Sequence, residues 1–524
     1  MKKVDDMNWD LNHEGNIKTN HANFKNVKEL LDSKGPGFCL AKWNQVTMHL
    51  GTGVTHSCHH PAVHKIPLEE LKDNPSALHN TKFKKEQRKT MLNGGRPKEC
   101  DYCWRIEDNN TGEFSDRVFK SLEPWALKHN DIIKDMDGDE NVLPTYIEVS
   151  FSNVCNMKCT YCGPEASSKW YEDIKQNGPI KLLEGTDDEY WAQGWQQDLE
   201  VFKNREYNPY VEAFWQWWPE LSKNLKVFRI TGGEPLMSKD TFKVLEDLIE
   251  NPRPDLEISI NTNLSVPDKL WNKFIGLAIQ LKDSNNIKNL TVYTSVEGWG
   301  ERAEYARTGL NFELFLQRYE QLISMGNIRA VLMSTYNMFS ITSFTRLLEW
   351  QYDLRLKYNK NPVVLNYAET GFRSPGHRLP ETDINWKQEL ATVCIDVPYL
   401  RHPTFLDCRN STHQLAEEYM LASLDYMASR TTYPGWTVHK GFEQNEIDKF
   451  KRIVFHRLYF NKKNSDGTPD YHNRRDLDLN RSQFYEFIQK IDQRNNTDFL
   501  STFPEMQEFY NECGEARDRI LNGR

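Results

Sequence analysis

The chain has no long hydrophobic run. No stretch approaches the roughly 18 consecutive apolar residues that a membrane-spanning helix needs. Residues 1–10 are polar and charged, and they lack the apolar core of a signal peptide. We therefore expect a cytoplasmic protein without a membrane partner.

An excess of basic charge is also missing. The 524 residues carry 66 Lys and Arg against 75 Asp and Glu, which gives a net charge of −9. This balance argues against nucleic acid as a partner, because nucleic-acid binding relies on clustered positive charge. The local basic stretch from Lys82 to Lys89 is more typical of a solvated helix face.

Several common functional motifs are absent. The sequence contains no internal repeat, Walker loop, dinucleotide-binding Gly-x-Gly-x-x-Gly or hydrolase nucleophile elbow. Cysteines number only ten, and in a reducing compartment they favour metal binding or catalysis over disulfides. Seven of them fall into two groups. The other three, Cys394, Cys408 and Cys513, have no chelating neighbour and are predicted to be structural.

The first group lies on one short loop. Cys155, Cys159 and Cys162 are separated by three and then two residues, after a strand-like segment at 145–152. Three thiolates can hold three irons of a [4Fe–4S] cube and leave the fourth open to a small molecule, whereas most cube sites supply four cysteines. The alternative is a zinc knuckle or three buried cysteines, although a structural zinc site takes four ligands.

This spacing resembles that of the radical S-adenosylmethionine (SAM) superfamily. The resemblance implies that SAM binds the open iron and is cleaved there to a 5′-deoxyadenosyl radical. It also implies an α/β fold, a partial (β/α)6 barrel, and strand and helix patterns do alternate after the loop. Six strands are expected, at 145–152, 225–231, 256–261, 290–295, 328–335 and 362–367.

Motifs at the strand ends fit the same family. The second strand ends in Thr-Gly-Gly-Glu-Pro, similar to the family motif that meets the amino group of SAM. The third has Leu264 where glycine is usual, and the fourth is followed by Glu297 where Asp is usual. By this resemblance, the predicted SAM contacts are Tyr161, Gly232, Gly233, Glu234, Asn263, Ser295, Arg307 and Asn337.

A second group of cysteines precedes the barrel: Cys39, Cys58, Cys100 and Cys103. It resembles the Twitch domain, a shortened SPASM domain with one auxiliary [4Fe–4S] cluster, placed here N-terminal to the barrel. Zinc is the alternative, bound by the four cysteines or by a mixed set that includes nearby histidines. These histidines, predicted mainly as exposed loop residues, are His56, His59, His60 and His64.

The motifs set the expected domain boundaries. Residues 1–37 form a polar segment, 38–120 the Twitch-like domain, 121–143 a linker, 144–380 the barrel and 381–524 a helical region. An aromatic-rich insertion at 170–221 either covers a substrate or packs as extra helices, and packing is slightly preferred.

Three functions stay open on this basis. The first is a radical SAM enzyme that abstracts hydrogen from a peptide or protein, since Twitch and SPASM domains are frequent in peptide maturases. The second is a dehydrogenase of a small alcohol or sugar. The third is a non-catalytic iron–sulfur or zinc scaffold, or an electron carrier. The enzyme would need a flavodoxin- or ferredoxin-type reductant, and no catalytic acid or base is assigned.

Overall fold

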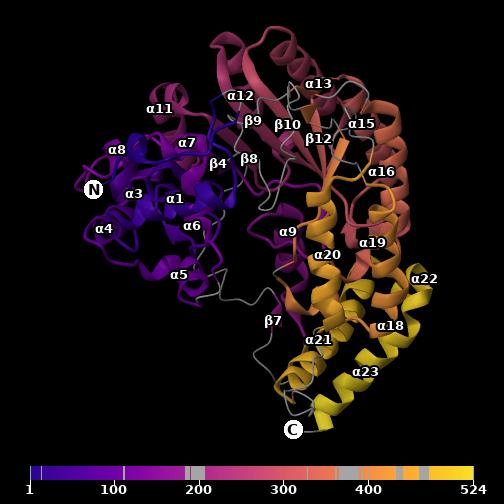
Figure 1. The fold of residues 1–524 in the computed structure, drawn as a ribbon. Coiled ribbons are helices and arrows are strands. Elements are labelled where there is room, and N and C mark those ends of the chain that lie inside the picture. The colour runs from indigo at the N-terminus through magenta and orange to yellow at the C-terminus, as the bar shows by residue number, and fades with distance from the viewer. Residues whose placement is uncertain are drawn as a thin grey trace.

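The computed structural model shows a mixed α/β fold around one nine-stranded sheet (Figure 1). The structure describes residues 2–12, 15–109, 112–182, 189–190, 207–326, 328–359, 363–364, 389–390, 393–400, 402–431, 441–459 and 471–522. Within these ranges, no helix combines the length and the apolar character that crossing a membrane requires.

Six parallel strands form the centre of the sheet. They are β4 (Tyr146–Ser150), β8 (Val227–Thr231), β9 (Arg253–Thr262), β10 (Ile287–Ser295), β12 (Arg329–Met333) and β15 (Val393–Asp396). Their order across the sheet follows the chain. Sequential parallel strands joined by helical crossovers are consistent with a partial (β/α) barrel. The first five predicted strands are confirmed to within a few residues.

The prediction of the sixth strand is wrong. Within the predicted segment 362–367, β13 (Val363–Val364) pairs antiparallel with β14 (Glu389–Leu390), outside the main sheet. The position beside β12 belongs to β15, which pairs with it in parallel. A four-residue strand is too short to show a clear alternation, so the longer apolar run looked more strand-like. The sheet therefore continues past residue 380, the predicted end of the barrel.

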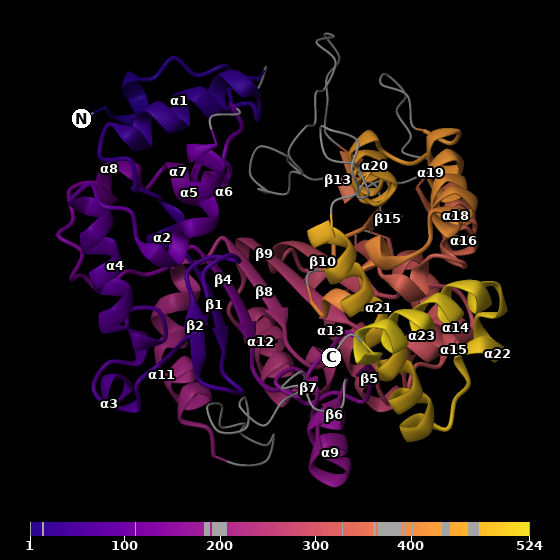
Figure 2. The same cartoon turned by 90° about the horizontal axis from the view of Figure 1, so that it is seen from below.

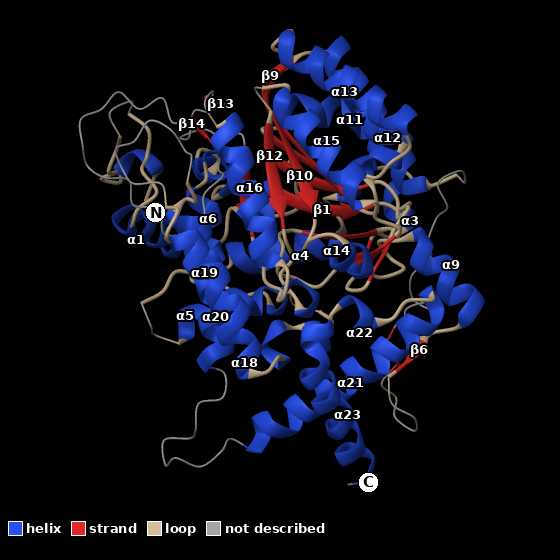
Figure 3. Ribbon diagram, turned by 90° about the vertical axis from the view of Figure 1, so that its right-hand side faces the viewer, coloured by secondary structure: helices blue, strands red, loops and turns tan. Residues whose placement is uncertain are grey.

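The central strands present two different faces. Ile147, Phe228 and Ile258 point to one side and belong to the main hydrophobic core. Their neighbours Glu148 and Arg229 point to the other side, because successive side chains alternate along a strand. Figures 2 and 3 show helices packed along the outer side of the strands. These helices are α11 (Pro209–Asn224), α12 (Lys239–Glu250), α13 (Asp268–Asp283), α15 (Phe312–Ser324) and α16 (Phe344–Tyr358).

The sheet also runs into the N-terminal region. Strand β1 (Gln45–His49) pairs in parallel with β4, and the hairpin of β2 (Val54–His56) and β3 (His64–Lys65) extends the sheet beyond β1. Helices gather around these strands on the indigo side of Figure 1. They are α1 (His21–Asp32), α2 (Ala41–Asn44), α3 (Leu68–Leu71), α4 (Lys82–Leu92), α5 (Asp101–Asp108), α6 (Asp116–Leu122), α7 (Pro124–Leu127) and α8 (Asn130–Ile133).

Two predictions for this region need correction. Residues 1–37 are not only a polar segment, because α1 buries Val27 and Leu31 completely. Residues 121–143 are not a linker, because α7 and α8 bury Trp125 and Ile133 in the same hydrophobic cluster. In both segments the apolar residues are few and widely spaced, so the charged residues between them dominated the sequence pattern.

The insertion and the tail are mainly helical where they are described. In the insertion, α9 (Ser168–Asn177), the hairpin of β6 (Ile180–Lys181) and β7 (Glu189–Tyr190), and α11 follow one another. Trp217 and Trp218 of α11 are buried in the core, which supports packing, while Trp191 and Trp195 lie outside the described residues. The tail contains α18 (His413–Leu415), α19 (Leu421–Ala428), α20 (Gln444–Tyr459), α21 (Tyr471–Asn495), α22 (Phe499–Thr502) and α23 (Gln507–Asn522).

Candidate functional site

The three-cysteine loop follows β4 at the carboxyl end of the sheet. Within it, β5 (Lys158–Cys159) pairs antiparallel with β11 (Arg307–Thr308). The fully buried Trp170 of α9 donates from its indole Nε1 to the Cys159 carbonyl oxygen at 2.7 Å. These contacts fix the loop from two sides, so its shape does not depend on a ligand alone.

The structure brings the three thiols of the loop together. Burial raises the pKa of Cys155 to about 12, and the neighbouring Cys159 raises it further. Burial likewise raises the pKa of Cys162, with added repulsion from Cys159 and Cys155. Such thiols do not ionise on their own, but a bound cation compensates the thiolate charge. The donor set therefore fits a thiolate-bound metal centre.

Gly232 and Gly233 serve a close backbone approach. A Cβ atom at Gly233 would lie 2.3 Å from the Val154 carbonyl oxygen, and one at Gly232 would lie 2.5 Å from the Ser150 hydroxyl. Gly232 also has a φ of +122°, which L side chains rarely adopt. The two glycines thus let the end of β8 pack against the segment that leads into the cysteine loop.

Glu234 and Asn263 connect the ends of neighbouring strands. The Glu234 carboxylate accepts from the backbone N–H of Asn263 at 2.7 Å and of Leu236 at 3.0 Å. Burial raises the pKa of Glu234 to about 7, although these N–H groups lower it. The Asn263 amide donates to the Asn156 side-chain oxygen at 2.8 Å, and its nitrogen lies 4.0 Å from the Cys155 sulfur. Asn263 therefore contacts the cysteine loop directly, and Glu234 holds Asn263 in place.

Arg307 is part of a buried charged network. Its Nε and Nη2 each donate to the Glu297 carboxylate at 2.6 Å, and Nη2 also contacts the Tyr161 hydroxyl. That hydroxyl donates to Glu297 at 2.6 Å, while Arg307 Nη1 lies 3.6 Å from the Cys159 sulfur. The family resemblance assigned Arg307 to SAM and gave Glu297 no role. In the structure the two form a bidentate pair beside a predicted ligand cysteine.

The remaining predicted contacts differ in accessibility. Ser295 ends β10 and is half-buried at the carboxyl edge of the sheet. Asn337 is fully buried, and its side chain accepts from the Phe339 N–H and donates to the Thr335 carbonyl oxygen. It therefore caps its own helical turn, a role that explains a polar residue there without a ligand.

The C-terminal region supports the same loop. Arg494 near the end of α21 donates to the Asp173 carboxylate at 2.6 Å, and Asp173 also pairs with Lys158 of the loop. Asn495 donates to the Thr308 hydroxyl at 3.0 Å, opposite Lys158 across the β5–β11 pair. Sequence patterns gave the tail no role, and these single side chains carried no recognisable motif.

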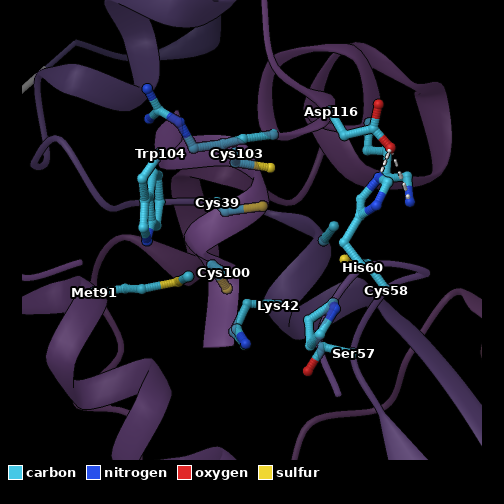
Figure 4. A pocket seen from close by; sticks show the side chains of 14 residues that line it. Cys39, Lys42, Ser57, Cys58, His60, Met91, Cys100, Cys103, Trp104 and Asp116 are labelled. Carbon is cyan, nitrogen blue, oxygen red and sulfur yellow. Dashed lines mark hydrogen bonds and ion pairs between the residues drawn. The ribbon is translucent and has the colours of Figure 1, made fainter. Parts of the chain in front are cut away.

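The second cysteine group surrounds one cavity. Figure 4 shows Cys39, Cys58, Cys100 and Cys103 around a central space, and all four line the same pocket. They come from the segment before α2, the loop after β2 and the start of α5. Burial raises the pKa of both Cys100 and Cys103 to about 12, and Cys39 and Cys58 add to each rise.

The spacing of these side chains bears on the kind of centre. Among the described residues, no three His, Cys, Asp or Glu side chains are arranged to hold a single metal ion. Ligands that share one zinc ion must meet around it, whereas each thiolate of a cube binds a separate iron. The same finding covers Cys155, Cys159 and Cys162, so the two cysteine groups are alike in this respect.

Charged side chains line the same cavity. Lys42 is buried and forms an ion pair with Glu99. His60 lines the cavity and contacts the Asp116 carboxylate through Nε2 at 2.5 Å. The prediction of exposed histidines is therefore wrong for His60, and also for His56, which is buried on β2. His56 is buried because side chains alternate between the two faces of β2, and His60 is buried because it packs against Asp116 of α6.

Comparison with known proteins agrees with the cysteine loop. Residues 149–346 match the family model described as Radical SAM superfamily. The chain is 25% identical over 121 residues to GTP 3′,8-cyclase of Campylobacter lari, which is 23% of this chain and 28% of that protein. It is 27% identical over 120 residues to GTP 3′,8-cyclase of Nautilia profundicola, which is 22% of this chain and 27% of that protein. The chain thus spans little more than a quarter of these relatives. Residues 149–346 carry a radical SAM superfamily domain.

Proposed function

We propose that this chain is a radical SAM enzyme that abstracts hydrogen from a peptide or protein. The observation that carries the proposal is the convergence of Cys155, Cys159 and Cys162 on one buried loop at the carboxyl end of the sheet. Ligands of open α/β sheets bind at that end. When bound there, a [4Fe–4S] cluster with one open iron supplies the electron that cleaves SAM.

The chain's own residues hold and shape this site. Arg307 directs a guanidinium N–H toward the Cys159 sulfur and stabilises negative charge there. Glu234 and Asn263 fix the strand ends beneath the loop. Of the proposed SAM contacts, Ser295 and Tyr161 have half-buried side chains, whereas Arg307 and Asn337 are buried and engaged within the protein.

We further propose an auxiliary [4Fe–4S] cluster held by Cys39, Cys58, Cys100 and Cys103. The convergence of four thiols on one cavity supports it. The preference for a peptide or protein rests on the resemblance of this set to a Twitch domain. A small-molecule substrate is the second candidate, favoured by the partial similarity to enzymes named for GTP.

The test is anaerobic reconstitution with iron and sulfide, followed by metal analysis and a SAM-cleavage assay with dithionite. We expect about eight irons per chain and release of 5′-deoxyadenosine. Replacing Cys155, Cys159 and Cys162 by Ala should leave about four irons and abolish cleavage. Cys394→Ala is the matched control, because that buried cysteine belongs to neither group.

Other outcomes point elsewhere. About four irons with cleavage, together with zinc, would make the N-terminal centre a zinc site. A fully loaded protein that does not cleave SAM would support the scaffold or carrier function instead. Stimulation of cleavage by peptide fractions, and not by small-molecule fractions of the same extract, would favour the peptide substrate.

A further inference from the structure

Helix α4 buries two basic side chains on one face. Lys84 and Arg88 are both 0% exposed, although the stretch from Lys82 to Lys89 was predicted as a solvated helix face. Lys82 is exposed, and Lys85 and Lys89 are partly exposed, so that prediction holds for one face only. Like charges four residues apart on a helix repel each other, and burial strengthens the repulsion.

Neutral groups surround both side chains. Lys84 Nζ donates to the Thr55 hydroxyl at 3.1 Å and lies 3.5 Å from His79 Nδ1. Arg88 Nη1 donates to the Asn80 oxygen at 2.8 Å, and Nη2 lies 2.8 Å from His79 Nε2. Neither forms an ion pair with a carboxylate among the described residues.

More distant acids do not supply a dedicated partner. Glu99 acts on Lys84 from a distance but is already paired with Lys42. Glu140 acts on Arg88 in the same way, while its two oxygens accept from the backbone N–H groups of Asp137 and Gly138. Burial and the neighbouring Arg88 hold the pKa of Lys84 well below its usual value, and burial lowers the pKa of Arg88 to about 9, so the charged forms of both side chains need an additional anion nearby.

The four-cysteine cavity is a candidate for the site of that anion, although neither Lys84 nor Arg88 lines it. Lys84 interacts electrostatically with Cys58, and Thr55, which accepts a hydrogen bond from Lys84, lies three residues before that cysteine. Arg88 Nε donates to the Lys42 carbonyl oxygen at 3.4 Å, and Lys42 lines the cavity. Met91, one turn beyond Arg88 on α4, lines the cavity as well. Helix α4 therefore runs along its wall.

We propose that Lys84 and Arg88 are the counter-charges of an anionic iron–sulfur centre held by Cys39, Cys58, Cys100 and Cys103, and that they raise its reduction potential. This rests on the proposed auxiliary cluster. Four thiolates outweigh the charge of the metal core, so the centre is a net anion. Positive charge beside it favours the more negative, reduced form. Lys42 contributes less, because Glu99 already compensates it.

The first test compares stability with and without metal. Lys84→Met keeps the length of the side chain and removes the charge, so the metal-free variant should unfold at a higher temperature than the metal-free wild type. The gain in unfolding temperature on loading should be smaller in the variant than in the wild type. Lys85→Met on the same helix is the control and should change neither value. An equal gain on loading in K84M and wild type would overturn the proposal.

The second test measures the potential of the N-terminal centre alone. The variant lacking Cys155, Cys159 and Cys162 removes the other cluster, and redox titration followed by electron paramagnetic resonance reports what remains. Lys84→Met in this background should shift the reduction equilibrium by roughly tenfold, about 59 mV more negative for one electron. If the centre is loaded with iron and its reduction potential does not change, the proposed role of Lys84 and Arg88 is wrong, while the auxiliary cluster itself stands. Zinc in place of iron overturns the auxiliary cluster itself, and failure of SAM cleavage in the complete protein concerns only the other site.

Discussion

The buried pair of Glu297 and Arg307 allows a quantitative test of the site. Glu297 is 0% exposed, and Arg307 and Tyr161 satisfy its carboxylate. Glu297→Gln removes the negative charge but leaves the guanidinium buried, which typically costs about 3–5 kcal/mol. Arg307→Met leaves the carboxylate buried with Tyr161 and should cost a similar amount. The double variant removes both charges and should cost far less than the sum.

The assay is a double-mutant cycle on the metal-free protein, with the free energy of unfolding from denaturant titration. We expect a coupling energy of about 2–4 kcal/mol. The exposed pair of Glu320 and Lys357 is the control, and its coupling should stay below about 1 kcal/mol. Additive losses at the buried pair would refute the reasoning, because they would mean that the two charges stabilise the fold independently.

Three further predictions follow from single contacts. Leu264 has a φ of +57° and is fully buried, so Leu264→Gly relieves about 1 kcal/mol of strain but loses a core side chain. The net loss of stability should be roughly 1–4 kcal/mol in a denaturant titration, and a gain would contradict the packing. Arg494→Met removes the buried contact to Asp173 and should lower the free energy of unfolding, measured by thermal unfolding, by about 2 kcal/mol. The same variant should retain less iron at the cysteine loop, whereas Gln489→Met, at an exposed position, should change neither value. His79 is fully buried, and burial together with Arg88 holds its pKa in the folded protein well below 6.5. At a pH between this lowered pKa and 6.5, the histidine is protonated in the unfolded chain but not in the folded protein. The free energy of unfolding should therefore fall as the pH drops below 6.5. His79→Asn should reduce the slope of this free energy against pH by up to about 1.4 kcal/mol per pH unit, and an unchanged slope would mean that His79 is protonated in the folded protein.

The cysteine groups were predictable from sequence because the chemistry dictates their spacing. Cys155, Cys159 and Cys162 must meet on one loop, and the distant Cys39 and Cys58 could be joined to Cys100 only through resemblance to a known domain. The structure brings the cysteines of each group close to one another, in two separate places. Their assignment as metal ligands stays a prediction until the metal is measured.

The surroundings of these groups were not predictable in the same way. Lys84 and Arg88 look like surface residues in a basic helix, because local sequence does not reveal which face of α4 is covered. Strand β1 reads Gln-Val-Thr-Met-His, and β2 has only three residues, so neither shows a clear period of two. Their place beside β4 depends on pairing between segments about 100 residues apart.

The parallel pairing of β1 with β4 has a consequence for handling the protein. The hydrogen bonds from β1 cover the edge of the strand that leads into Cys155. A shortened chain that starts at residue 144 would uncover that edge and leave its N–H and C=O groups free to join other chains. Such a truncated barrel would tend to aggregate, and the fragment 1–143 would lose the neighbour of β1. The two cysteine groups are therefore built on one continuous sheet, and dissecting them calls for point substitutions and not for cutting the chain.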